Sequence, residues 1–222
     1  FGEYTNNMDR IPIPGKIIPC NLSETKYQEE LTNKLKTAGF RTREGVVTAA
    51  KYLSSEFEYN VPYFFSGGHS WRPDFDADGG ISADWGCKKT VPESALKYGG
   101  EKRPLGLDCS GFVTWCYLTA GFKDYYGNPE YRHTNGNKER VDFTKENCES
   151  VMKKLQPGDV LVKQGGGSGY HTSIVLWVEN NTIKYAHSTS GGVQVDFFGC
   201  NDIKFNYVDY MQKYFDKFSE GE

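Results

Sequence analysis

A cysteine in this chain stands where a turn predicts the start of a helix. Residues 107–113 read Leu-Asp-Cys-Ser-Gly-Phe-Val, and apolar residues continue at helical spacing as far as Ala120. Asp108 is a suitable N-cap for this helix, and Gly121 is a suitable stop. A thiol at a helix N-terminus feels the positive end of the helix dipole, which favours the thiolate. Cys109 is therefore predicted to be a nucleophile, and a small buried core residue is the alternative.

A cysteine nucleophile needs a base, and the chain contains four histidines that could supply it. His171 begins an apolar, β-branched run that predicts a strand, and His187 lies in the next predicted strand. In this arrangement His171 would take the thiol proton. His187 would accept a hydrogen bond from the other ring nitrogen of His171 and fix its tautomer. The remaining two, His69 and His133, lie in polar segments and are expected to be exposed to solvent.

The loop between the two strands decides whether these histidines share a face of the sheet. Residues 179–182 read Glu-Asn-Asn-Thr, which predicts a hairpin turn. A three-residue loop, 179–181, would place Ser173 opposite His187 and both histidines on one face. A two-residue Asn-Asn loop would place them on opposite faces, because side chains alternate along a strand. The catalytic interpretation therefore requires an odd loop or a β-bulge.

The ordered motifs resemble those of the NlpC-type cell-wall cysteine peptidases. The matching segments are Val-Pro-Tyr-Phe-Phe-Ser-Gly-Gly at 61–68, Asp-Cys-Ser-Gly-Phe-Val at 108–113 and Leu-Gln-Pro-Gly-Asp-Val at 155–160, together with the two strand histidines. The chain order of cysteine, histidine and polar residue is also that of papain-like peptidases. The resemblance extends over roughly residues 44–198.

This resemblance implies roles for six residues. Cys109 would be the nucleophile, His171 the base and His187 the third polar residue. The substrate site would be lined by Tyr63, Asp108 and Ser110. The resemblance also implies an α+β, papain-like fold and a secreted or cell-wall-associated bacterial protein. Its substrates would be peptidoglycan stem peptides, usually cut between γ-D-glutamate and a diamino acid, and no cofactor is expected.

Two long insertions separate the motifs, at about 69–106 and 123–154. Because both flank motifs that should line the cleft, the first is expected to wall off part of the groove with Trp71 and Trp85. It also contains an acidic run with carboxylates at Asp74, Asp76 and Asp78, which follows the first part of a calcium loop. The glutamate expected at position twelve of such a loop is replaced by Trp85, so calcium and a solvated acidic loop both remain open. No metal ligand is assigned.

Composition fits one compact enzyme. The 222 residues carry a net charge of −3, with 26 basic and 29 acidic residues and no basic block, which argues against a nucleic-acid partner. No apolar run is long enough to span a membrane, and no signal peptide is visible. Because the chain begins at Phe1, removal of an export signal or of further domains is compatible with it. The oligomeric state is not indicated.

The six cysteines include no Cys-x-x-Cys pair, which argues against a zinc site. Cys116 lies on the same helix stripe as Cys109 and is expected in the core. If Cys109 stays free, the others can form at most two disulfides with one cysteine left over.

Helices are predicted at 25–38, 43–57 and 207–218, and a further strand at 193–197. Residues 1–40 are interpreted as an N-terminal arm and helix, and 41–222 as the catalytic domain with its two insertions. An α+β fold follows, with helices packed on a small antiparallel sheet and the nucleophile on a helix that faces it.

The predicted function is a cysteine endopeptidase that forms a thioester intermediate. The alternatives are a cell-wall amidase or acyltransferase on the same fold, or a non-catalytic wall-binding module.

Overall fold

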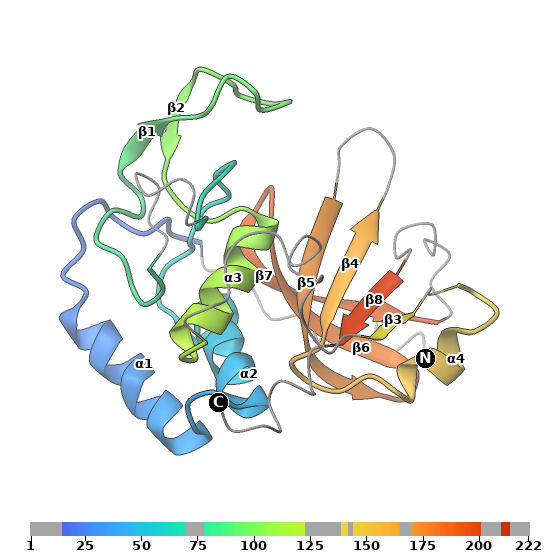
Figure 1. Ribbon diagram of the computed structural model, residues 1–222. Coiled ribbons are helices and arrows are strands. Elements are labelled where there is room, and N and C mark those ends of the chain that lie inside the picture. Colours follow the sequence, from blue (N-terminus) through green and yellow to red (C-terminus); the bar gives the residue numbers. More distant parts are fainter. Residues whose placement is uncertain are drawn as a thin grey trace.

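The computed structural model describes residues 15–69, 78–122, 139–141, 144–164, 170–200 and 210–213. Three helices gather on one side of an antiparallel sheet (Figure 1): α1 (Thr25–Ala38), α2 (Arg43–Lys51) and α3 (Cys109–Thr119). A short two-stranded ribbon, β1 (Lys88–Thr90) with β2 (Lys102–Pro104), extends from the helical side. This arrangement confirms the predicted α+β fold.

The main sheet has the strand order β3-β8-β4-β5-β6-β7, and every neighbouring pair is antiparallel. Its strands are β3 (Glu139–Val141), β4 (Val160–Gln164), β5 (Tyr170–Glu179), β6 (Thr182–Thr189), β7 (Gly192–Gly199) and β8 (Tyr210–Lys213). The long β5, β6 and β7 are consecutive hairpin partners, and α3 packs against β5 and β6. The start of α3 is thereby brought to the strands that carry the two predicted catalytic histidines.

The first two helices follow the predicted apolar stripes. In α1 the side chains of Tyr27, Leu31 and Leu35 are buried, and Gly39 ends the helix at a φ of 97°. In α2 the Thr42 hydroxyl caps the first turn through the Gly45 N–H. The predicted helix at 43–57 continues beyond α2 as a π-helical turn, η2 (Tyr52–Glu56), which the Phe57 N–H closes on the Tyr52 carbonyl at 2.7 Å. Both predicted helices are therefore present, the second with a changed final turn.

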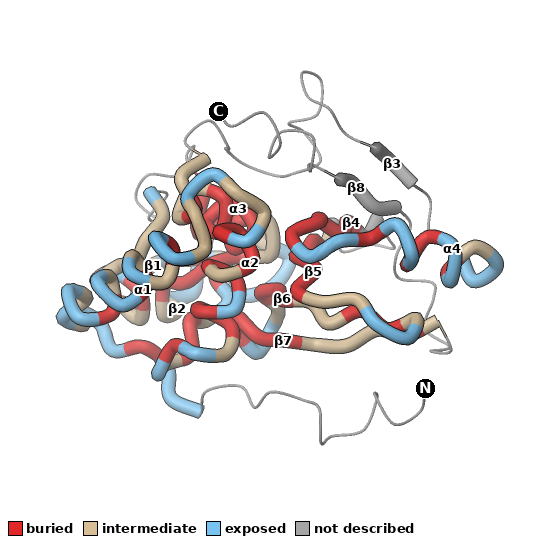
Figure 2. The backbone as a smooth tube through the Cα atoms, turned by 90° about the horizontal axis from the view of Figure 1, so that it is seen from below, coloured by how far each residue is buried: buried red, intermediate tan, exposed pale blue. Residues whose placement is uncertain are grey.

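The helix that carries the cysteine lies in the middle of the protein. Figure 2 shows α3 and α2 mostly buried, whereas α1 exposes one side. Every residue of α3 from Gly111 to Tyr117 is buried. This explains why the segment is apolar on all sides, and its rigid surroundings hold the first turn of the helix in place.

The Leu-Gln-Pro-Gly-Asp-Val motif joins β4 to the helices. Asp159 is completely buried and forms an ion pair with Arg43 of α2 at 2.7 Å. The same Arg43 Nη1 donates to the Pro157 carbonyl at 2.8 Å, and the second carboxylate oxygen of Asp159 accepts the Gln156 N–H at 2.8 Å. The motif therefore fixes the start of β4 against the N-terminus of α2.

The first insertion leaves and rejoins the fold at one place. The segments that flank it meet in a parallel bridge between Tyr63 and Leu107, and the Asp108 N–H donates to the Gly67 carbonyl at 3.3 Å. Trp85 is buried in the core, 6.0 Å from the ring of Trp115. The expectation that Trp85 walls off the groove is wrong, because this large apolar ring packs against α3 instead.

Other predictions on this insertion fall partly outside the described residues. Trp71, Asp74 and Asp76 lie outside them, so the calcium-loop interpretation stays untested, while Asp78 is exposed.

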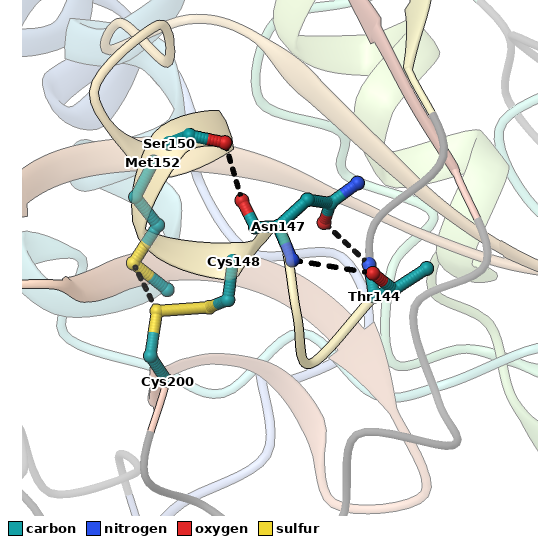
Figure 3. Close-up of a disulfide and its surroundings, with 6 residues drawn as sticks. All are labelled: Thr144, Asn147, Cys148, Ser150, Met152 and Cys200. Atoms are coloured by element: carbon teal, nitrogen blue, oxygen red, sulfur yellow. Dashed lines mark hydrogen bonds between the residues drawn. A yellow bond between two sulfur atoms is a disulfide. The ribbon is translucent and has the colours of Figure 1, made fainter.

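Two disulfides tie the insertions to the rest of the fold. Cys20–Cys87 links the N-terminal segment to the first insertion, and Cys148–Cys200 links α4 (Cys148–Met152), in the second insertion, to the end of β7 (Figure 3). Cys109 and Cys116 are free thiols, and Cys116 is buried as predicted. The chain therefore forms two disulfides, the largest number expected with Cys109 free, and Cys116 is the cysteine left over.

The predicted helix at 207–218 is wrong where the structure describes it. Residues Tyr210–Lys213 form β8 between β3 and β4. Tyr and Phe have high strand propensity, and pairing with β4 overrides the helical spacing of the apolar residues. His133 lies outside the described residues.

Candidate active site

The carboxylate before the cysteine organises the start of α3. Asp108 is the N-cap of the helix, and its Oδ1 accepts the Gly111 N–H at 2.7 Å. Its Oδ2 accepts the Ser66 N–H at 2.9 Å, from the segment just before the first insertion. The carboxylate therefore fastens the Pro-Tyr…Gly-Gly segment to the first turn of the nucleophile helix.

His69 completes this cluster, contrary to the prediction that it is exposed. The residue is only 2% exposed, and its Nε2 lies 2.8 Å from Oδ1 and 3.0 Å from Oδ2 of Asp108. The Ser110 hydroxyl lies 3.1 Å from the same nitrogen and donates to Asp108 Oδ1 at 3.2 Å.

Two glycines explain why a histidine from a polar segment is buried here. A Cβ on Gly67 would lie 2.1 Å from the Gly106 carbonyl oxygen, and a Cβ on Gly68 would lie 2.9 Å from the Gly111 Cα. The Gly-Gly backbone can therefore press against α3 and deliver His69 directly to Asp108. The Gly67-Gly68 pair is the feature of the sequence that could have predicted the burial of His69.

Cys109 stands at the first position of α3, partly exposed, beside β5 and Tyr63. The backbone N–H groups of Thr172, Ser110 and Cys109 itself lower the thiol pKa, as a helix N-terminus should. Burial of the sulfur, and next the negative charge of Asp108, act in the opposite direction and raise that pKa to about 12. Desolvation thus opposes the helix terminus, which by itself would favour the thiolate.

Tyr63 lies close to the same charges. Burial raises the pKa of its phenol, and electrostatic interactions with Cys109, when that thiol is ionised, and with Asp108 raise it further. About a third of the residue remains exposed, at 37%. Tyr63 is thus a protonated hydrogen-bond donor at neutral pH, at the mouth of the site.

The raised thiol pKa predicts how Cys109 reacts with iodoacetamide. Because only the thiolate reacts and its fraction grows tenfold per pH unit below the pKa, we expect the alkylation rate to rise steadily from pH 6 to pH 9. Mass spectrometry of the modified peptide measures this rate in the folded protein. A rate that is already constant across this range would contradict the prediction and indicate a resting ion pair.

The two strand histidines meet. The Nε2 of His171 lies 2.8 Å from the Nδ1 of His187, and the two rings are nearly perpendicular, at 73°. The hairpin loop is the two-residue one, with Asn180 and Asn181 both at positive φ, 50° and 57°. A bulge between Val175 and Trp177 shifts the register and restores the shared face. The β-bulge that the catalytic interpretation required is therefore present.

Strand β7 contributes two polar residues to the site that were not predicted from the sequence. The His187 Nε2 lies 2.7 Å from Asp196 Oδ2 on β7, and the Gln194 amide donates to the same oxygen at 2.7 Å. Gln194 and Asp196 alternate with Val193 and Val195, a pattern that places both polar side chains on one face. The alternation is visible in the sequence. The strand register that brings these side chains next to His187 is known only from the folded sheet.

Comparison with known families gives a match over the second part of the chain. The sequence profile of the NlpC/P60 family matches residues 93–219, a segment that contains Cys109, His171 and His187. The chain belongs to the NlpC/P60 family. Members of this family are generally cell-wall cysteine peptidases, and their substrate is peptidoglycan. The two disulfides and the NlpC/P60 family suggest an extracellular or cell-wall location.

A solved structure of an NlpC/P60 family protein from Bacillus cereus ATCC 10987 is similar, with 19% sequence identity and a TM-score of 0.39. The match covers 80% of this chain and 42% of that chain, so the present chain spans less than half of that protein. No curated protein matches the chain. Within the part of the chain that the structure describes, no helix has the length and apolarity needed to cross a bilayer.

Proposed function

We propose that this NlpC/P60 protein is a cysteine endopeptidase that cuts peptidoglycan stem peptides at the bond between γ-D-glutamate and the diamino acid. The observation that carries the proposal is the hydrogen bond between His171 Nε2 and His187 Nδ1, beside a free cysteine at a helix N-terminus. The Thr172 N–H, which follows His171 directly, is a hydrogen-bond partner of the Cys109 sulfur. A nucleophile, a base and an orienting residue therefore come from α3, β5 and β6.

The reaction begins with a neutral thiol. His171 Nδ1 removes the proton from Cys109 Sγ while the sulfur attacks the amide carbonyl, because burial and the charge of Asp108 raise the thiol pKa. The negative oxygen of the tetrahedral intermediate accepts hydrogen bonds from the Cys109 N–H and the Tyr63 hydroxyl. The C–N bond then breaks, the leaving amine takes the proton from His171, and a thioester remains on Cys109.

Hydrolysis of the thioester completes the cycle. A water molecule gives a proton to His171 and attacks the thioester carbonyl. The C–S bond breaks, the proton returns to the sulfur, and a carboxylic acid is released. No cofactor takes part in these steps.

The contacts of Asp108 suggest a different role from the substrate contact that the resemblance implied. Its two oxygens accept hydrogen bonds from the Ser66 N–H, the Gly111 N–H, His69 and Ser110. A carboxylate offers about four acceptor positions, so little capacity is left for a peptide amine. We propose that Asp108 positions the helix, while Tyr63 and Ser110 contact the peptide. We also propose 41–222 as the catalytic unit, with α1 packed against α2.

Mass spectrometry of defined muropeptides after incubation with the protein tests the function. Release of the diamino acid, with the L-alanyl-γ-D-glutamate dipeptide left attached to the muramic acid, supports the endopeptidase. An amidase would release the intact stem from the glycan, and an acyltransferase would join the acyl group to another amine. Unchanged muropeptides would indicate a non-catalytic wall-binding module and would reject the proposal.

The two histidines should differ in importance. Replacing His171 by Ala removes the base and is expected to lower kcat by about 10³-fold or more. Replacing His187 by Ala leaves the base but removes its partner, so a smaller loss, roughly 10- to 100-fold, is expected. Steady-state hydrolysis of one tripeptide substrate measures both variants. Equal or reversed losses would mean that the roles are exchanged.

A further inference from the structure

A carboxylate outside the proposed triad lies at the far end of the histidine pair. His187 contacts His171 through Nδ1 at 2.8 Å and Asp196 through Nε2 at 2.7 Å. Three side chains from β5, β6 and β7 therefore form one continuous chain of hydrogen bonds. Both ring nitrogens of His187 therefore have a hydrogen-bond partner. The residue is buried, with its side chain 8% exposed.

The chemistry of a carboxylate fixes the direction of these hydrogen bonds. An ionised carboxylate accepts only, so the hydrogen between Asp196 and His187 must be on His187 Nε2. A neutral imidazole with its hydrogen on Nε2 presents a lone pair at Nδ1. The contact with His171 therefore needs a hydrogen on His171 Nε2, which leaves the lone pair of His171 on Nδ1. That is the form in which His171 can accept the thiol proton.

We propose that Asp196 is a positioning residue that sets the tautomers of both histidines, so that His171 presents a basic Nδ1 to Cys109. The proposal rests on the function proposed above. Asp196 acts through His187 and touches neither the substrate nor the sulfur.

Gln194 holds the carboxylate in place. Its amide donates to the same Oδ2 that accepts from His187, at 2.7 Å, and its side chain lies opposite His187 in the β6–β7 register. Two donors thus converge on one oxygen, which fixes the acceptor toward the histidine. With a neutral residue in place of Asp196, the series of hydrogen bonds would no longer end in a negative charge. His187 would then lose the interaction that stabilises its Nε2–H tautomer.

Several titratable or charged groups lie near the His171–His187 pair. Among the described residues these are Tyr185 on β6, whose ring centroid lies 4.9 Å from that of His187, and Cys109 and Asp108 at the start of α3, beside β5. Lys184 is directed to Phe197, with its ammonium 5.9 Å from that ring. Asp196 is the carboxylate that hydrogen-bonds to His187.

Nitrogen chemical shifts of the imidazoles test the proposal without any substrate. In the ¹⁵N-labelled folded protein at pH 8, long-range ¹H–¹⁵N correlation should show hydrogen on Nε2 of both His171 and His187. In the Asp196→Ala variant the preference at His187 should be lost, with mixed tautomers at both rings. A wild-type protein with the hydrogen on Nδ1 of His187 overturns the proposal.

Kinetics with a stem tripeptide provide the second measurement. Asp196→Ala should lower kcat by about 10- to 100-fold with little change in KM, since the residue does not touch substrate. Asp196→Asn keeps an acceptor but removes the charge, so a smaller loss is expected.

The matched control is Glu179→Gln, which removes a carboxylate at the exposed end of β5, and it should behave as wild type in both measurements. Wild-type kcat in Asp196→Ala, or a loss that appears in KM and not in kcat, overturns the proposal. If Asp196→Ala does not fold, as judged by circular dichroism, Asp196→Asn carries both measurements. An inactive wild-type protein would reject the endopeptidase function, whereas the nitrogen shifts would still decide the role of Asp196.

Discussion

Replacing Cys109 by Ala is expected to lower peptide hydrolysis by about 10⁴-fold or more, because no other group near the site can form the thioester. The fold should survive. Asp108 caps α3 through the Gly111 N–H, so the cap does not involve the thiol, and Ala has the highest helix propensity. Muropeptide hydrolysis followed by mass spectrometry measures the loss, and urea denaturation measures the stability.

Cys116→Ala provides the matched control for this experiment. Cys116 is the second free thiol and lies on the same helix, but it is completely buried. Its replacement removes one small buried group, so a loss of about 1 kcal/mol in the free energy of unfolding is expected, with activity retained. Hydrolysis at the wild-type rate by Cys109→Ala, or its loss in Cys116→Ala alone, would show that the nucleophile is misassigned.

Local patterns were sufficient to predict the helices and the chemistry they carry. The stripe of Leu31 and Leu35 with Gly39 as a stop defines α1, and Asp108 before an apolar run defines the start of α3. The shared face of His171 and His187 could be stated only as a condition, an odd loop or a bulge. Whether the chain meets that condition depends on packing around Leu176, which no local pattern encodes.

The missed residues all depend on contacts between distant segments. His69 is buried because the backbone at Gly67 and Gly68 packs closely against the start of α3. Asp196 reaches the histidine pair because the β6–β7 register places it diagonally across from His187. The pKa of the Cys109 thiol depends on distant segments for a related reason. A helix terminus is visible in the sequence, but the desolvation that opposes it depends on everything packed around the sulfur.

The Arg43–Asp159 pair is expected to have the largest effect on stability. Replacing Asp159 by Ala should reduce the free energy of unfolding by about 3–5 kcal/mol, because the change leaves a guanidinium uncompensated in a mostly buried place. Arg43 is 17% exposed and Asp159 is fully buried, so water can do little to replace the lost contact. The same change also removes the acceptor of the Gln156 N–H.

A surface pair in the same protein shows what the loss would be without burial. Lys34 and Glu56 lie 3.0 Å apart, with side chains 40% and 42% exposed. Replacing Glu56 by Ala should cost at most about 1 kcal/mol, since exposed pairs contribute little. Urea unfolding of the wild type and both variants gives the comparison. Similar losses at the two sites would contradict the role of burial. A loss at Asp159 of several kcal/mol would instead show that the Leu-Gln-Pro-Gly-Asp-Val motif holds β4, and through it β5 with His171, against the helices.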